Sequence, residues 1–367
     1  MNETAITWII FILAFGGMVI IHEFGHFIVA RLCKIEVEEF GIGLPTPGAI
    51  TLFTWQGTRF TLNWLPLGGF VRPKGENDPN IPGGLAAANP WKRFAVLAAG
   101  PLMNLLTAVL VYSFIFARVG VPDTNRVLVT DVVAESPAAQ GGFESGDVFI
   151  SATGQPISTY DDLRAIVDSS DGVPVVFLME RDGEQVQLTA IPKFNETEDR
   201  AMIGVGLGVP YTTPTSLGET IQFGAQYTYL IVRNLLSLPA QLIRGSLTPE
   251  QSRVIGLKGI YDIMEVSVER GIEASETAPA SQPFDWYIPA LEIVAVLSIS
   301  LGIFNLFPFP ALDGGRIIFL LPELVFRRRV PARVENLVHA LGMTVLLLFM
   351  IYVNVMDFVN PLNLTAP

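Results

Sequence analysis

Residues 6–30, ITWIIFILAFGGMVIIHEFGHFIVA, decide the fold of this chain. The stretch is almost wholly apolar apart from one pentapeptide, HEFGH at 22–26. About 20 mostly apolar residues are enough for a helix to cross a hydrocarbon core of about 30 Å, so the stretch predicts a membrane span. It lacks the basic n-region and the small-residue cleavage site of a signal peptide, and we therefore expect it to stay in the membrane.

The composition is that of a membrane protein. Of 367 residues, 50% are hydrophobic and 16% are charged, and the mean hydropathy is +0.46. Three further apolar stretches, 93–117, 287–308 and 335–356, predict three more spans. The net charge of −12 argues against nucleic acid as a partner.

Basic residues near the ends of the spans predict the orientation in the membrane. The segments 31–93 and 313–334 hold many arginines and lysines, whereas no basic residue precedes the first span. The positive-inside rule then places both segments in the cytoplasm and places 118–285 and both termini outside. With no transit peptide, we expect a multi-pass protein of a bacterial inner membrane.

HEFGH has the residue types and the spacing of a zinc site. Residues four apart share one face of a helix, so His22 and His26 can bind one ion while Glu23 lies beside a water on that ion. Zinc in a hydrolase needs a third protein ligand and an open position. Because ionisable groups within a span are costly, these three residues indicate a functional site.

Asp313 is the predicted third ligand. It lies in NLFPFPALDGGR, 305–316, where Pro308 and Pro310 end the third span and two glycines permit a close turn. The predicted orientation places Asp313 at the same depth as the two histidines. The alternative is an ordinary solvated Asp-Gly-Gly turn. The remaining histidine, His339, is interpreted as a packing or interfacial residue.

Together, HEFGH and NLFPFPALDGG resemble the site-2 protease family of intramembrane zinc metalloproteases, in particular the bacterial branch that includes the sigma-E regulating protease. The resemblance implies zinc ligands at His22, His26 and Asp313 and a catalytic base at Glu23. It also implies that two asparagines bind substrate backbone near the metal: Asn104, within AAGPLMNLL at 98–106, and Asn305. Hydrogen bonding between helices is the alternative role for both asparagines.

The first cytoplasmic loop is predicted to carry a β-hairpin at about 40–72. Apolar and polar residues alternate around Gln56-Gly57-Thr58, and a glycine-rich return follows. Relatives have a membrane-dipping β element here, and strand addition to its edge would hold an unwound substrate. The alternative is a small interfacial hairpin that anchors the loop.

The external segment resembles a single PDZ domain, predicted at 118–200. SPAAQGGFESGDVFISATGQPI at 136–157 carries the resemblance, and Thr159–Ser169 is predicted to form a helix with Leu163, Ile166 and Val167 facing inward. A PDZ domain binds a peptide or chain end by strand addition, or it acts as a steric filter. Residues 201–286 are expected to form an extracytoplasmic linker with an interfacial helix at 227–243. A fifth span is the alternative, and the short length, Pro239 and the topology disfavour it.

We therefore expect an α-helical polytopic membrane protein in which 1–117 and 287–367 form the two halves of a protease core. The expected activity is zinc-dependent hydrolysis of peptide bonds within or near transmembrane helices, near the cytoplasmic side. By resemblance, substrates would be single-span proteins already trimmed by another protease, such as anti-sigma factors or signal-peptide remnants. A proteolytically silent PDZ-bearing scaffold or chaperone is the alternative. A transporter is disfavoured because the sequence has no internal repeat.

Overall fold

A computed structural model describes residues 3–76, 78–196, 198–248, 253–277 and 285–362. The chain divides into two compact units. One unit combines Met1–Ile115 with Thr220–Pro367, and the other is Phe116–Glu219. We call them the membrane unit and the β-rich unit and describe each by itself.

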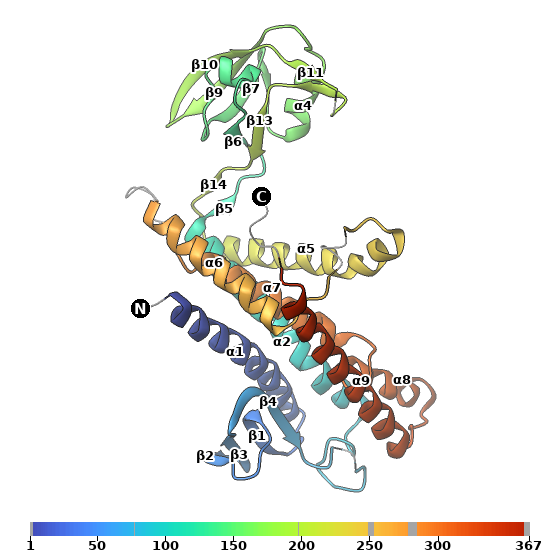
Figure 1. Cartoon of the computed structure of the whole chain (residues 1–367). Coiled ribbons are helices and arrows are strands. Elements are labelled where there is room, and N and C mark those ends of the chain that lie inside the picture. Colours follow the sequence, from blue (N-terminus) through green and yellow to red (C-terminus); the bar gives the residue numbers. More distant parts are fainter. Residues whose placement is uncertain (1–2, 77, 197, 249–252, 278–284, 363–367) are drawn as a thin grey trace. The chain divides into compact units, whose positions relative to one another are not determined.

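Four helices of the described residues are long and apolar enough to cross a membrane. They are α1 (Glu3–Leu32), α2 (Pro90–Val119), α7 (Ile288–Leu306) and α9 (Ala332–Val359), shown in Figure 1. Each contains or closely matches one predicted apolar stretch, so the four predicted stretches are the four candidate spans of the structure. Length and hydropathy suffice here because a spanning helix satisfies its own backbone hydrogen bonds.

A four-stranded sheet follows α1 in the chain. Its strands are β1 (Val37–Leu44), β2 (Ile50–Trp55), β3 (Thr58–Leu62) and β4 (Leu65–Pro73), in the order β2-β3-β1-β4. Strands β2 and β3 are antiparallel around Gln56 and Gly57, both at positive φ, so the predicted hairpin is confirmed. Strand β4 is an edge strand and packs against α1 (Figure 1).

Three further helices belong to the membrane unit: α5 (Leu217–Arg244), α6 (Leu257–Thr277) and α8 (Asp313–Phe326). The predicted interfacial helix is longer than 227–243 and continues through Pro239. Helix α6 was not predicted, and it packs against α1, α7 and α9 with Met264 and Val268 buried. Helix α8 replaces the loop that the sequence indicated around Asp313.

The β-rich unit is built on a six-stranded sheet. Five strands follow the order β10-β9-β7-β6-β13, and β8 pairs with β7. Helix α4 runs from Tyr160 to Asp168, within the predicted Thr159–Ser169, and its buried side chains are the three predicted ones. A capping box between Thr159 and Asp162 begins the helix. The elements are β5 (Val121–Pro122), β6 (Val127–Val132), α3 (Pro137–Gln140), β7 (Val148–Ala152), β8 (Gln155–Pro156), β9 (Val175–Arg181), β10 (Glu184–Ala190), β11 (Lys193–Asn195), β12 (Arg200–Met202), β13 (Val205–Gly208) and β14 (Tyr211–Thr212).

Candidate metal centre

Helix α1 presents two histidines one turn apart. His22 and His26 are both buried, and their ring centroids are 4.8 Å apart. The Nε2 atom of His26 lies 3.2 Å from the Nε2 atom of His22. The four-residue spacing places both rings on one face of the helix, and this face points into the protein.

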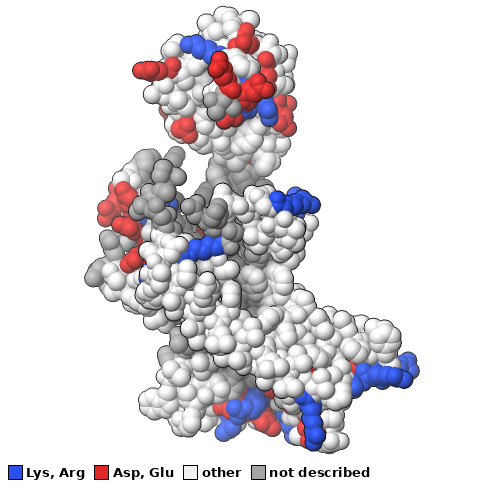
Figure 2. Space-filling view, turned by 45° about the vertical axis from the view of Figure 1, so that its right-hand side comes forward, with Lys and Arg blue, Asp and Glu red and all other residues white. Residues whose placement is uncertain are grey.

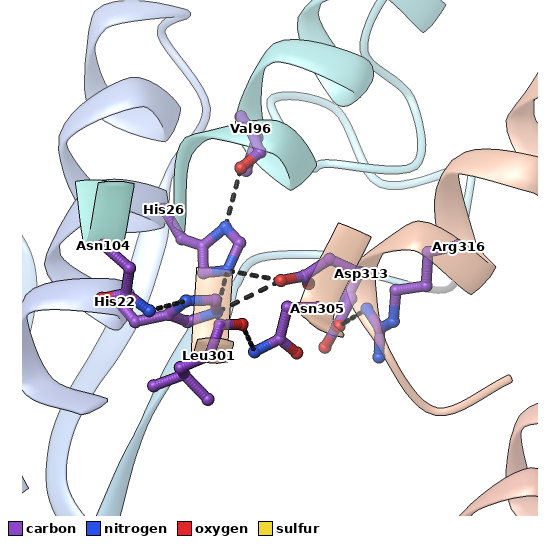
Figure 3. Close-up of polar contacts among 9 residues, drawn as sticks. His22, His26, Val96, Asn104, Leu301, Asn305, Asp313 and Arg316 are labelled. Atoms are coloured by element: carbon purple, nitrogen blue, oxygen red, sulfur yellow. Dashed lines mark hydrogen bonds and ion pairs between the residues drawn. The ribbon is translucent and has the colours of Figure 1, made fainter. Parts of the chain in front are cut away.

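Asp313 completes a group of three ligand atoms. Its Oδ2 atom lies 3.2 Å from Nε2 of His22 and 3.3 Å from Nε2 of His26 (Figure 3). Ligand atoms at the corners of a tetrahedron, each about 2.0–2.1 Å from a zinc ion, lie about 3.3 Å apart. The three atoms therefore fit three corners of a tetrahedral zinc site. Among the described residues, this is the group of histidine, cysteine and acidic side chains that could hold a metal.

The Nδ1 atom of each histidine ring also has a polar contact. Nδ1 of His26 donates to the carbonyl of Val96 at 2.7 Å, which leaves Nε2 free to bind a metal. Nδ1 of His22 lies 3.1 Å from the side-chain amide of Asn104, which is fully buried. The Oδ1 atom of Asn104 has no hydrogen-bond partner among the described residues. With the Asn104 amide turned so that Oδ1 accepts a hydrogen bond from Nδ1–H of His22, Oδ1 has a partner. Nε2 of His22 is then free for the metal.

A cavity of about 240 Å³ opens beside the three ligands. Glu23 lines it and lies close to the backbone of Val71 on β4. Glu23 also lies against Gly69 of the same strand. The carboxylate is therefore placed between the ligand group and an edge strand of the sheet.

The two predicted asparagines differ in position. Asn305 lines the cavity, but its Nδ2 atom donates to the Leu301 carbonyl of its own helix at 2.9 Å (Figure 3). Asn104 does not line the cavity and contacts His22 instead. Of the six predicted site residues, five line one cavity, and the sixth orients a histidine.

Helix α8 carries Asp313 at its first position, and this corrects the expectation of a turn. The loop 307–312 precedes the helix, and a Cβ atom at Gly314 would collide with the Phe307 and Leu306 carbonyls. One at Gly315 would collide with the Phe309 carbonyl. Both glycines are helical, so they permit close packing of α8 on the loop rather than a turn.

Three supports of the site were missed by the sequence analysis. A Cβ atom at Gly100 of α2 would collide with Nε2 of both histidines. His339 on α9 was interpreted as a packing residue, yet its Nδ1 atom accepts a hydrogen bond of 2.9 Å from the Ala311 backbone in the loop before Asp313. Arg316, one turn after Asp313, pairs with Glu76. Of these three supports, Gly100 could have been found from the sequence, because it precedes Pro101 within the stretch AAGPLMNLL at 98–106.

The chain is similar to known proteins over most of its length. Residues 10–349 match the model of peptidase family M50. The chain belongs to this family. A relative from Clostridium perfringens, named as a zinc metalloprotease, is 32% identical over 97% of this chain and 99% of its own length. One from Brucella suis, named likewise, is 31% identical over 95% of this chain and 93% of its own length. The metalloprotease MmpA of Caulobacter vibrioides is 29% identical over 91% of each chain.

As an M50 peptidase, the protein is a zinc metalloendopeptidase with membrane-spanning helices. Solved structures similar to parts of the chain include the PDZ domain of an SdrC-like protein from Listeria monocytogenes, with 19% identity and a TM-score of 0.21 over 23% of this chain and 87% of that one. Another is a Geobacillus thermodenitrificans structure with 28% identity and a TM-score of 0.21 over 23% of this chain and 98% of that one.

Proposed function

We propose that this M50 peptidase cleaves peptide bonds within or near transmembrane helices of other proteins, with zinc held by His22, His26 and Asp313. The observation that carries the proposal is the convergence of these three ligand atoms, 3.2–3.3 Å apart, between α1 and α8. Helix α1 is apolar enough to span a membrane. A hydrolytic site built on such a helix acts on substrates that are themselves in the membrane.

Glu23 acts as the general base. When bound, zinc supplies Lewis acidity to the scissile carbonyl and to the attacking water. The Glu23 carboxylate takes a proton from that water and returns it to the leaving amine. Val96 and Asn104 fix the two histidine rings, while Glu23 lies beside Gly69 and Val71 of β4. These contacts orient the reacting groups before the substrate enters.

The edge of β4 holds the substrate in an extended conformation. A helical substrate hides its peptide bonds in its own hydrogen-bond ladder, so it must be unwound before cleavage. Phe70, Val71 and Pro73 of β4 line the cavity beside Glu23. Strand addition at this edge would bring an extended peptide to the carboxylate. The cavity-lining Asn305 is a candidate to bind the backbone of the same peptide.

The β-rich unit acts as a PDZ-type domain on the outer side of the membrane. A groove of about 380 Å³ lies between α4 and the strands β12 and β13. Strand β13 is an edge of the sheet, so a chain end can add to it. The unit would bind the chain end of a pre-trimmed single-span substrate, or it would sterically exclude untrimmed substrates. The anti-sigma factors and signal-peptide remnants implied by the resemblance fit this role.

The decisive experiment compares wild type with Glu23→Gln, both purified in detergent and incubated with a trimmed single-span substrate. We expect cleavage by wild type alone and about one zinc per chain in both proteins, because the variant loses the base and keeps the ligands. Cleavage by the variant would exclude Glu23 as the base. Zinc binding without cleavage by wild type across a panel of substrates would favour a silent PDZ-bearing scaffold.

A further inference from the structure

Helix α8 has two unlike faces. Arg316, Leu320 and Glu323 follow one another at spacings of four and three and so share a face. Leu320 is 1% exposed, Arg316 pairs with Glu76, and Glu323 forms an ion pair of 2.6 Å with Arg93 on α2. Asp313 lies one turn before Arg316 on the same side. This face attaches α8 to the half of the site that carries the histidines.

The opposite face of α8 is apolar and exposed. Ile318, Leu321 and Val325 form a row along it, and Val325 is 67% exposed. Phe326, at the end of the helix, is 72% exposed. Ile318 and Leu321 are 42% and 45% exposed. An amphipathic helix with such a face lies in the interfacial layer of a bilayer.

Basic side chains gather where α8 ends and α9 begins. Arg327, Arg328 and Arg333 are exposed, and no described residue pairs with their guanidinium groups. The sequence has no acidic residue between Glu323 and Glu335. Figure 2 shows basic side chains at the lower end of the membrane unit, beyond a wide area of uncharged surface. Because α9 begins at Ala332, these arginines lie at the end of a candidate span, where lipid headgroups are found.

We propose that Arg327, Arg328 and Arg333 bind the headgroup of an anionic phospholipid and that this contact holds α8 where Asp313 meets His22 and His26. Charge favours an anionic headgroup over a zwitterionic one. Exposed apolar side chains lie on α8 and also on α9, for example Leu337 and Leu341, and they favour a lipid with acyl chains over a soluble acidic peptide. The catalytic consequence rests on the proposed function.

The coupling to Asp313 follows from the stiffness of a short helix. Helix α8 has 14 residues and is therefore about 20 Å long, with the ligand at one end and the arginines at the other. Its protein contacts described above all lie on one face. A lipid whose headgroup binds the basic end and whose acyl chains cover the apolar row would supply a contact on the other face and limit rotation of the helix about its axis. Arg329 adds a fixed point, since it donates to the Ala86 carbonyl at 2.8 Å.

Lipid binding is tested by native mass spectrometry on delipidated Glu23→Gln protein titrated with phosphatidylglycerol or phosphatidylcholine. We expect retention of phosphatidylglycerol alone and a loss of at least tenfold in apparent affinity in Arg327→Gln/Arg328→Gln. Arg233→Gln/Arg244→Gln, which removes two exposed arginines of α5, is the matched control and should bind as the parent does. Equal binding by both double variants, equal binding of the two lipids, or displacement of phosphatidylglycerol by a soluble acidic peptide would overturn the site.

The coupling is tested by the rate at which a chelator removes zinc from protein in nanodiscs. We expect slower loss with phosphatidylglycerol than with phosphatidylcholine alone, and no such difference in Arg327→Gln/Arg328→Gln. Equal rates in the two lipids for wild type would overturn the coupling. Neither measurement needs proteolysis, so a failure of the proposed function appears separately, as bound zinc without substrate cleavage.

Discussion

Nε2 of His22 and Oδ2 of Asp313 lie 3.2 Å apart, although they come from the first and the eighth helix of the chain. The pair forms because α8 is attached to α2 through Arg93 and Glu323 and to the segment after β4 through Arg316 and Glu76. The proposed zinc site therefore depends on charged contacts between the two halves of the membrane unit as well as on its ligands.

Breaking the Arg93–Glu323 pair should weaken zinc binding. Both side chains are mostly buried, and loss of one partner of a buried pair costs about 3–5 kcal/mol. We expect Arg93→Gln to lower the thermal unfolding temperature and to speed zinc loss, and the exchanged pair Arg93→Glu/Glu323→Arg to recover much of both. Arg59→Gln, at a side chain that is 56% exposed, is the control and should change neither.

Adding one methyl group at Gly100 should destroy the site. Its Cβ atom would collide with Nε2 of both histidines, so Gly100→Ala must displace the ligand atoms. We expect loss of bound zinc, measured by elemental analysis, with the helical content retained. Gly17→Ala on α1 is the matched control because nothing lies within 4 Å of its added Cβ. A zinc-replete Gly100→Ala protein would show that the histidines can move without loss of the site.

His339 should matter as a hydrogen-bond acceptor. His339→Phe leaves the partly buried backbone N–H of Ala311 without its acceptor, at a cost of about 1 kcal/mol, and loosens the loop before Asp313. We expect faster zinc loss to a chelator. His339→Asn can offer an oxygen near the position of Nδ1 and should therefore restore part of the zinc retention. Equal retention in wild type and His339→Phe would reduce His339 to the packing role expected from sequence.

The β-rich unit should depend on pH through Asp147. Asp147 is fully buried, and Arg181 donates to it at 2.6 and 2.8 Å. Burial raises the pKa of Asp147, but hydrogen bonds from Arg181 and from the Glu144 backbone lower it further, so it lies below its ordinary value of 3.8. A carboxyl with a depressed folded pKa stabilises the fold above pH 3.8, and this contribution is lost as pH falls through the folded pKa.

Arg181→Met should therefore destabilise the β-rich unit most at neutral pH, where it leaves a buried carboxylate without its partner. We expect about 1–3 kcal/mol of lost protection in residues 116–219, followed by hydrogen exchange in the whole protein. This loss of protection should become smaller toward pH 4, because the unpaired carboxyl of Asp147 becomes protonated. Arg164→Met, at a guanidinium that is 60% exposed, is the control. A deficit that does not change with pH would contradict the role of Asp147.

The sequence by itself determined the elements whose signals are local. Apolar length predicted four spans, because a helix in lipid must satisfy its own backbone. The four-residue spacing of His22 and His26 placed both on one face, and Gln56-Gly57 predicted the β2–β3 hairpin. These features depend on neighbours within a few positions, so no knowledge of packing was needed.

The tertiary structure alone decided how distant elements meet. It made Asp313 the first residue of a helix, turned Asn104 toward His22, and brought His339 to the loop before α8. Arg316 and Glu76 gave no sign of their pairing in the sequence. Such contacts depend on how helices pack and on which charges share a buried boundary, and these are properties of the whole fold that no local periodicity encodes.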